Sequence, residues 1–362
     1  MIGGGVVGLS IAYGLAKAGE RVRLLDEGDD AFRAARGNFG LVWVQGKGAG
    51  KPAYALWSMA ASKLWPDFAS DLEEIAGVSL QLSQPGGLAL CLDEIELEKR
   101  SDMMAQLAAD VAAMGEAYPY DILRANAVRE LCPHVGPDVV GASFCPLDGH
   151  VSPLRLLRAL TAALLALGGE LQTGRHVDSI EYRDAEFRIH TGGTIHVAAK
   201  LVLAAGLGNA GLAPMVGLAA PVKPVRGQVL ISERVAPFLE WPTGSVRQTG
   251  DGGVQIGESK EDVGFDDGTT MAELSRIAER AARMFPVLAG VNIVRTWGAL
   301  RVMTPDGYPI YQASTECPGA FVATCHSGVT LAAQHAGPLV GWIKGGAEPA
   351  ALASFKAERF HV

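Results

Sequence analysis

The chain has 362 residues, more than one hydrophobic core usually holds, so we expect two connected domains. A net charge of −8 and the lack of Lys/Arg runs argue against nucleic acid as a main partner, because phosphate binding needs clustered positive charge. Arginines or glycines interrupt both long apolar stretches, 154–169 and 198–216, so neither predicts a membrane span. The five cysteines form no Cys-x-x-Cys pair, which favours a cytoplasmic protein with reduced thiols.

Three glycines near the start have the spacing Gly3-x-Gly5-x-x-Gly8, and a helical pattern of apolar residues follows them directly. In this motif the first glycine allows a tight turn between strand and helix. The second lets the backbone approach a pyrophosphate, and the third packs the helix against the strand. The spacing predicts a dinucleotide site, and taken alone it fits a NAD dehydrogenase as well as a flavoprotein.

A strand predicted at 21–25 ends on Asp26 and Glu27, where a carboxylate that binds ribose hydroxyls is expected. Only Met1 and Ile2 precede the glycines, although a buried strand of about five residues is usual there. We therefore expect the natural chain to begin earlier. The alternative is a sheet that accepts a very short strand at its centre.

Helical and strand-like patterns alternate over the rest of the chain, and residues 36–48 have the frequent glycines of backbone that turns sharply or approaches a ligand. We predict helices at 54–75, 95–114, 120–131 and 271–285, one that begins at Pro153 and ends before Gly168, and a last long helix opened by 325–332. We predict strands at 88–92, 187–190, 195–197, 228–231, 245–248, 253–256 and 320–324, and a buried strand within 201–206.

Three features go beyond the first glycine motif. A second strand with a small-residue turn lies at 203–209, the C-terminal part repeats the strand-and-glycine pattern, and two blocks interrupt the nucleotide domain. This interleaving resembles the D-amino-acid-oxidase superfamily of FAD-dependent amine oxidoreductases over nearly the whole chain. Segments 36–48 and 325–332 resemble the bacterial flavin subunits of opine oxidases, D-hydroxyproline dehydrogenase and hydrogen cyanide synthase.

The resemblance implies an α/β fold in which a Rossmann-like FAD-binding domain is interleaved with an antiparallel-sheet substrate domain. The FAD-binding domain would comprise residues 1–77, 145–215 and 297–362. The substrate-binding domain would comprise residues 78–144 and 216–296.

FAD, bound without a covalent link, is the cofactor that the resemblance implies. Asp26 would bind the adenosine ribose, the backbone at Val177 would meet the adenine, and a helix beginning at 327–330 would stabilise negative charge on the reduced flavin. The residues expected at the cofactor are Gly3, Gly5, Val6, Val7, Gly8, Asp26, Glu27, Arg36, Asn38, Phe39, Gly40, Leu41, Val177, Ala205, Gly206, Leu207, Arg301, Ser327, Gly328, Val329 and Thr330.

Arg301 and His326 are the expected catalytic residues. Arg301 matches the family's carboxylate-binding position, and its forked guanidinium suits two oxygens; the alternative is a surface ion pair. His326 would contact substrate or flavin, and the alternative is a structural histidine. The expected pocket residues are Trp43, Gln45, His150, Trp297 and Tyr308.

The function that the resemblance implies is oxidation of the C–N bond of a small carboxylate-bearing amino acid or N-substituted amino acid, of the D-amino acid, hydroxyproline or opine type. Hydride would pass to flavin N5 without an essential general base. We expect a dehydrogenase subunit whose electrons leave through partner subunits or a membrane acceptor. The alternatives are a free-standing glycine/sarcosine-type oxidase that uses oxygen, and a flavin-containing assembly or tRNA-modification component.

Overall fold

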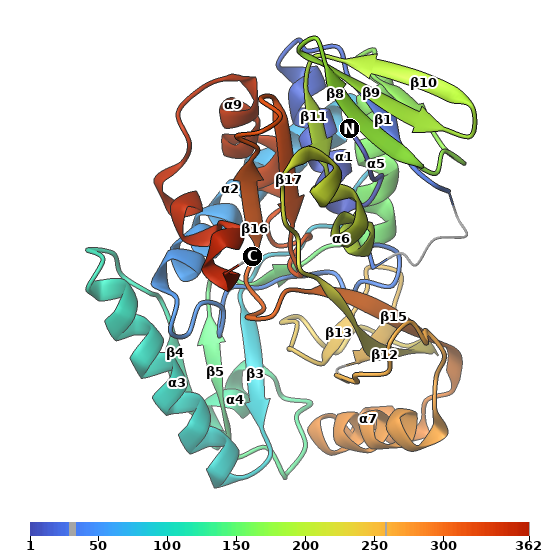
Figure 1. Ribbon diagram of the computed structural model, residues 1–362. Helices are drawn as coiled ribbons and strands as arrows, with labels where there is room; N and C mark the ends of the chain where they lie inside the picture. Colours follow the sequence, from blue (N-terminus) through green and yellow to red (C-terminus); the bar gives the residue numbers. More distant parts are fainter. Residues whose placement is uncertain (29–33, 258, 362) are drawn as a thin grey trace.

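The computed structural model describes residues 1–28, 34–257 and 259–361, and its upper half in Figure 1 is built on a mainly parallel sheet. In spatial order the strands are β7 (Glu170–Gln172), β1 (Arg23–Leu25), β11 (Leu201–Leu203), β17 (Ala320–Thr324) and the antiparallel β16 (Ile310–Ala313). Ile2 joins β1 to β11 through single parallel bridges to Leu25 and Leu203. The centre of the sheet thus accommodates the very short strand, whereas an earlier natural start stays a prediction.

Helices cover one face of this sheet, where their apolar residues form a single core with Leu24, Val202 and Phe321 of its strands. The helices are α1 (Val6–Lys17), α2 (Pro52–Ala76), α5 (Pro153–Ala166), α8 (Ala332–Ala336) and α9 (Pro338–Lys344). Helix α1 is buried along almost its whole length, and Gly8 allows its close approach, since a Cβ there would overlap the carbonyl oxygen of Gly3. The third glycine of the motif therefore packs the helix against the sheet, as predicted.

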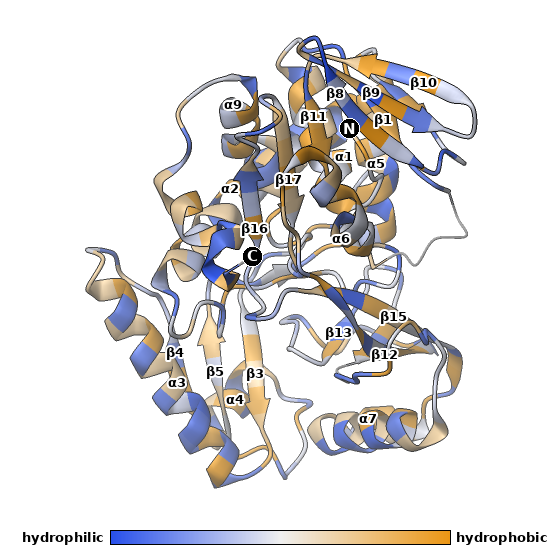
Figure 2. Cartoon of the chain, in the orientation of Figure 1, coloured by the Kyte–Doolittle hydropathy of each residue, from blue (hydrophilic) through white to orange (hydrophobic). Residues whose placement is uncertain are grey.

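Two antiparallel sheets form the lower half in Figure 1. One has the order β3 (Gly87–Cys91), β5 (Gly141–Cys145) and β4 (Asp121–Arg124), and the other β13 (Val246–Gln248), β14 (Gly253–Gly257), β12 (Lys223–Arg234) and β15 (Ile293–Met303). Helices α3 (Glu94–Ala112), α4 (Ala125–Leu131) and α7 (Met271–Met284) accompany them. Helix α7 buries Leu274, Ile277, Ala281 and Met284 at helical spacing, and Figure 2 shows its hydrophilic residues on the outer side.

A third small sheet contains β8 (Ser179–Arg183), β9 (Glu186–Thr191) and β10 (Thr194–Ala198), and β2 (Leu41–Val42) pairs with β6 (Gly149–His150). The predicted hairpin across Gly192 and Gly193 is confirmed, and both glycines have positive φ, as a tight hairpin turn requires. Short helical segments fill the connections: α6 (Asn209–Leu212), Gly206–Gly208, Ala213–Val216, Pro286–Gly290, Ala350–Phe355 and Ala357–Phe360.

The structure corrects two helix predictions. Residues 120–131 form β4 followed by α4 instead of one helix. The last long helix is two short ones, because Pro338 lacks the N–H that would continue α8, and α8 begins at Ala332 instead of at 327.

The expected α/β fold with antiparallel sheets is confirmed. The domain division stays a proposal, and its boundary at 296/297 falls inside β15. Among the described residues, no helix combines the length and apolar character needed to cross a bilayer.

Candidate cofactor and substrate site

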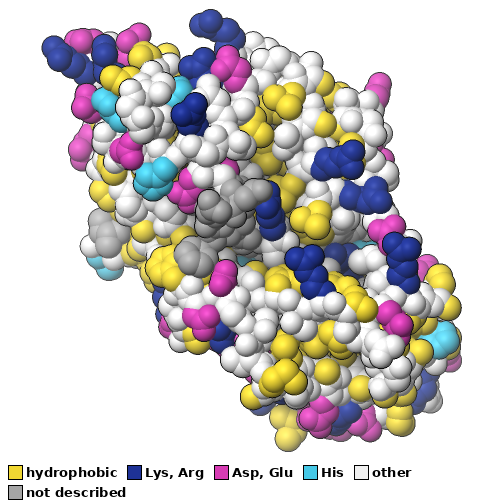
Figure 3. Space-filling model, turned by 90° about the vertical axis from the view of Figure 1, so that its right-hand side faces the viewer, with side chains coloured by type: hydrophobic (Ala, Val, Ile, Leu, Met, Phe, Trp, Pro, Cys, Tyr) yellow, Lys and Arg dark blue, Asp and Glu magenta, His cyan; other side chains and the backbone are white. Residues whose placement is uncertain are grey.

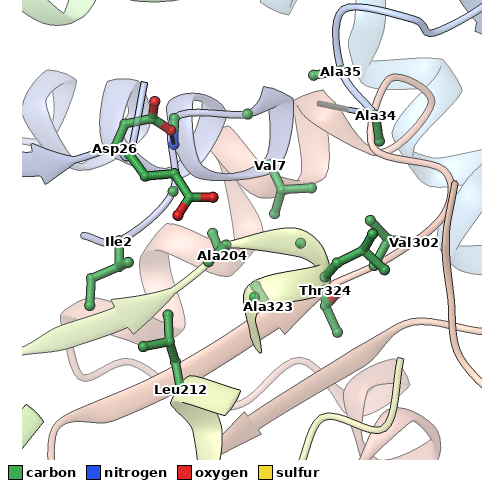
Figure 4. A pocket seen from close by; sticks show the side chains of 18 of the residues that line it. Ile2, Val7, Asp26, Ala34, Ala35, Ala204, Leu212, Val302, Ala323 and Thr324 are labelled. Atoms are coloured by element: carbon green, nitrogen blue, oxygen red, sulfur yellow. Dashed lines mark hydrogen bonds between the residues drawn. The ribbon is translucent and has the colours of Figure 1, made fainter. Parts of the chain in front are cut away.

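A cavity of about 380 Å³ lies where the parallel strands end (Figure 4). Its lining includes Asp26 after β1, Gly3 after Ile2, Ala204 after β11 and Cys325 after β17. Ligands of open α/β sheets bind at this carboxyl edge. The topology of the sheet therefore brings segments from the whole length of the chain to one cavity.

The glycine turn forms one wall of this cavity. Gly3 has a φ of +103°, and a Cβ there would overlap the carbonyl oxygen of Ala204. Gly5 differs, because a Cβ added to it would lie 3.9 Å from its nearest neighbour, the Cβ of Ala35. The first glycine thus serves the turn, and the second leaves an open surface onto which a pyrophosphate fits.

The two adjacent carboxylates after β1 have different environments. Asp26 is 8% exposed and accepts hydrogen bonds from the N–H groups of Gly4 (2.6 Å) and Gly28 (3.0 Å). Glu27 contacts His176 at 2.9 Å near the surface. Asp26 is therefore the carboxylate held in a fixed orientation beside the glycine turn.

Thirteen of the predicted cofactor residues line the cavity: Gly3, Gly5, Val6, Val7, Asp26, Glu27, Asn38, Val177, Ala205, Gly206, Leu207, Gly328 and Val329. An acid beside a glycine turn, and a lining that extends from Val177 to His326, fit the ribose, pyrophosphate and ring system of FAD.

The remaining predicted cofactor residues lie outside this lining. Gly8 packs α1, and Arg36 lines a different groove. Thr330 Oγ1 accepts from the N–H of Trp43 at 3.1 Å and donates to the carbonyl of Leu41 at 3.3 Å, so it holds the loop after β2 in place. The others outside the lining are Phe39, Gly40, Leu41, Arg301 and Ser327.

A buried arginine that the sequence did not single out supports the loop at Phe39. Arg247 on β13 donates to the carbonyl of Phe39 and to Oε1 of Gln255, and its Nη1 lies 3.3 Å from His150 Nδ1. Burial lowers the pKa of Arg247 to about 10, and burial together with the Arg247 charge lowers that of His150 to about 4. His150 is thus a buried partner of Arg247 and lies outside the lining of the cavity, so its predicted role in the substrate pocket stays a prediction.

His326 projects from the turn after β17 with its ring exposed to the cavity. Desolvation by the surrounding cavity wall and the positive charges of Lys47, Arg301 and Lys260 lower its pKa to about 3, which favours the neutral ring. Its neighbour Ser327 is buried and accepts hydrogen bonds from Lys47 Nζ and from Tyr54 OH, the latter at 2.9 Å.

Arg301 lies on β15 next to Val302, which lines the cavity. Its Nη1 donates to the carbonyls of Ser259 (2.6 Å) and Arg226 (3.3 Å). The guanidinium lies over Gly227 of β12, where a Cβ would come within 2.5 Å of Cζ. The missing side chain at Gly227 therefore makes room for the planar group.

Three other predicted pocket residues also lie outside the lining of the cavity. Gln45 is 2% exposed and both ends of its amide are hydrogen-bonded, because Nε2 donates to Gly87 O and Oε1 accepts from Ser143 and Arg100. Tyr308 donates to Ala49 O at 2.7 Å and does not line the cavity. Trp43 is partly buried, and its ring packs close to Gly87 and Gly244.

Trp297 lines a second groove, of about 910 Å³, together with Arg36. Leucines of α5 and the arginines Arg158 and Arg295 complete its wall. On the face shown in Figure 3 the surface is hollowed, with Lys and Arg side chains around apolar ones. Trp297 and Arg36 are therefore not neighbours of His326 in the first cavity.

Lys47 and Arg247 are the functional candidates that the sequence reasoning missed. Lys47 stands between Gly46 (φ +81°) and Gly48 (φ +85°), so a lone charged residue between two glycines was the available signal. For Arg247 the signal was weaker, because its burial depends on strands and loops far away in the sequence.

Comparison with known proteins places the chain in a family. The family described as FAD dependent oxidoreductase (DAO) matches residues 1–339. An opine oxidase subunit from Rhizobium meliloti is 41% identical over 360 residues, which cover 99% of this chain and 96% of the relative. Glycine oxidase from Geobacillus kaustophilus is 27% identical over 90% of this chain and 86% of the relative.

A solved structure of glycine oxidase from Geobacillus kaustophilus has the same fold, with a TM-score of 0.86 and 26% identity over 98% of this chain and 96% of that one. The NAD dehydrogenase considered from the glycine motif alone is excluded by the family match. The chain belongs to the DAO family of FAD-dependent oxidoreductases, and its cofactor is FAD.

Proposed function

We propose that the chain is the flavin-bearing subunit of a dehydrogenase that oxidises the C–N bond of an N-substituted amino acid of the opine type. The observation that carries this proposal is the 41% identity to an opine oxidase subunit, which extends over 99% of the chain. The relative's name describes one subunit of an enzyme, so the proposal includes partner subunits that receive the electrons.

Bound FAD would supply the oxidising chemistry by accepting hydride from the carbon next to the amine nitrogen. The protein's own residues bind and orient the substrate. Arg301 binds a carboxylate through its fork of N–H donors, which fixes the direction of the reacting C–H bond. His326, neutral because its pKa is about 3, offers a hydrogen bond beside the cavity without adding charge. The imine product reacts with water to give an oxo acid and an amine.

A free-standing oxidase that passes electrons to oxygen is the second candidate. The similarity to glycine oxidase, 27% identity over 90% of the chain, favours it. Both candidates use the same cofactor cavity and differ only in where the electrons go.

Anaerobic flavin reduction by the purified holoenzyme tests the proposal with opines, proline derivatives, D-amino acids, glycine and sarcosine. We expect opines to bleach the flavin absorbance and air to yield little peroxide. Full peroxide yield with prompt bleaching would establish the oxidase instead. Failure of every amine in the panel to bleach the flavin would refute both candidates.

A further inference from the structure

The backbone of its loop directs Lys47 toward Ser327, the neighbour of His326. Gly46 and Gly48 on either side have positive φ, and a Cβ on Gly48 would overlap the N–H of Ala55 at the start of α2. The loop therefore lies tightly on α2. The Lys47 side chain points to Ser327, where its ammonium donates to Oγ.

Ser327 connects Lys47 to the cavity. Its Oγ lies 3.5 Å from Nδ1 of His326, and His326 lines the cavity. Tyr54 donates to the same Oγ at 2.9 Å, which holds the hydroxyl in place. The Lys47 ammonium thus stands one hydroxyl away from the ring that borders the candidate substrate position.

The ammonium of Lys47 lacks a counter-ion among the residues that the structure describes. Its hydrogen-bond partner there is Ser327 Oγ, and the carboxylate of Asp148 acts on it through its charge, without a hydrogen bond. The nearby carboxyl of Asp148 is engaged by the N–H groups of Val44 and Gln45. Desolvation lowers the pKa of Lys47 to about 8, and a partly buried charge without an ion pair is costly, so the position is suited to an anionic ligand.

Two further cations approach the same histidine. The charges of Arg301 on β15 and of Lys260 after β14 act on His326 together with that of Lys47. Lys47 comes from the loop after β2, so the positive groups reach His326 from separate elements of the fold. One carboxylate would engage Arg301 and leave Lys47 without a partner.

We propose that Lys47 binds a second carboxylate of the substrate, so that the site selects secondary amines that carry a carboxylate on each arm. This inference rests on the proposed function and narrows its substrate class. Opines are such amines, with one carboxylate on either side of the nitrogen. Glycine and sarcosine have a single carboxylate and would leave the Lys47 ammonium unpaired.

A matched pair of ethers tests the inference by binding alone. Oxydiacetate and methoxyacetate differ by one carboxylate, and neither can be oxidised as an amine. Their dissociation constants are measured from the change in flavin absorbance of the holoenzyme. We expect oxydiacetate to bind at least about tenfold more tightly, the scale of one charge-assisted hydrogen bond.

Substitutions then assign the preference to Lys47. We expect Lys47→Met and Lys47→Gln to weaken oxydiacetate about tenfold or more and to change methoxyacetate less than about twofold. Gln retains a donor for Ser327 and keeps the test usable if Met disturbs folding. Lys51→Met is the control, because Lys51 lies over the Tyr308 ring at 5.7 Å and should leave the preference intact.

Equal binding of the two ethers to the unsubstituted protein would overturn the inference. So would an equal loss for both ethers in both Lys47 variants, which would indicate a general effect on the site. These outcomes are separate from the proposed function, which fails if no amine reduces the flavin or if air gives full peroxide yield.

Discussion

The N–H of Gly4 donates to Oδ2 of Asp26 across 2.6 Å, which ties the glycine turn to the end of β1. The N–H of Gly28 donates to the other carboxylate oxygen at 3.0 Å. These two contacts fix the orientation of the carboxylate beside the cavity where a ribose is expected. Figure 4 shows its side chain beside the turn.

Asp26→Asn should weaken FAD binding about tenfold or more, since it removes a charged acceptor whose orientation the backbone fixes. The dissociation constant of FAD for the apoprotein is the measurement. Glu27→Gln is the matched control, because Glu27 contacts His176 near the surface. A larger loss from Glu27→Gln than from Asp26→Asn would reverse the assignment of the ribose-binding carboxylate.

Gly5→Ala should leave folding nearly unchanged and weaken FAD binding. The new Cβ has room in the protein, with its nearest neighbour 3.9 Å away, and the φ of −78° suits alanine. The same methyl group would occupy the surface onto which the pyrophosphate fits. Thermal unfolding of the apoprotein measures the effect on folding. Titration of the apoprotein with FAD measures the effect on cofactor binding.

Gly341→Ala is the control for Gly5→Ala. Gly341 lies in α9, and a Cβ added to Gly341 meets nothing within 4 Å. We expect it to retain FAD fully. Undiminished FAD affinity in Gly5→Ala would mean that the pyrophosphate lies elsewhere.

Local motifs were the part of the fold and site that the sequence predicted well. The turn at Gly3, the acid at Asp26 and the hairpin at Gly192 each depend on a few consecutive residues whose backbone requirements are visible in the chain. Parallel strands then bring the turn and the acid together, because their carboxyl ends share one edge of the sheet.

Side chains whose surroundings depend on distant segments were predicted poorly. The amide oxygen of Gln45 accepts from Arg100 and Ser143, which lie 55 and 98 residues away in the sequence. Trp297 and Arg301 share β15, but four residues of strand span about 13 Å, and only Trp297 lines the second groove. Neither relationship leaves a pattern in the neighbouring residues.

Arg301→Lys should raise KM for carboxylate substrates about tenfold or more, because a lysine keeps the charge and loses the two-pronged contact. Bound FAD should be retained, since Arg301 lies outside the cavity lining. Steady-state kinetics and the flavin spectrum measure the two effects. Arg295 lies on the same strand but lines the second groove, so Arg295→Lys should change neither KM nor the bound FAD. An unchanged KM in Arg301→Lys would refute the role of Arg301.

Asp148 predicts a distinct pH dependence of stability. Its carboxyl is fully buried, Oδ1 accepts from Val44 and Gln45, and Oδ2 has no hydrogen-bond partner among the described residues. Burial raises its pKa from 3.8 to about 7. Between those values the native state binds more protons than the unfolded state, so this group's contribution to stability falls as pH rises from about 4 to 7.

Asp148→Asn should remove this pH-dependent contribution to stability, while the amide oxygen still accepts from the N–H groups of Val44 and Gln45. The free energy of unfolding of the variant should therefore rise relative to the unsubstituted chain by about 2–4 kcal/mol between pH 4.5 and pH 7.5. Denaturant unfolding at the two pH values is the measurement, with Asp121→Asn as the exposed control. A difference that stays constant or shrinks as pH rises would show that Asp148 is ionised throughout and stabilised by its surroundings.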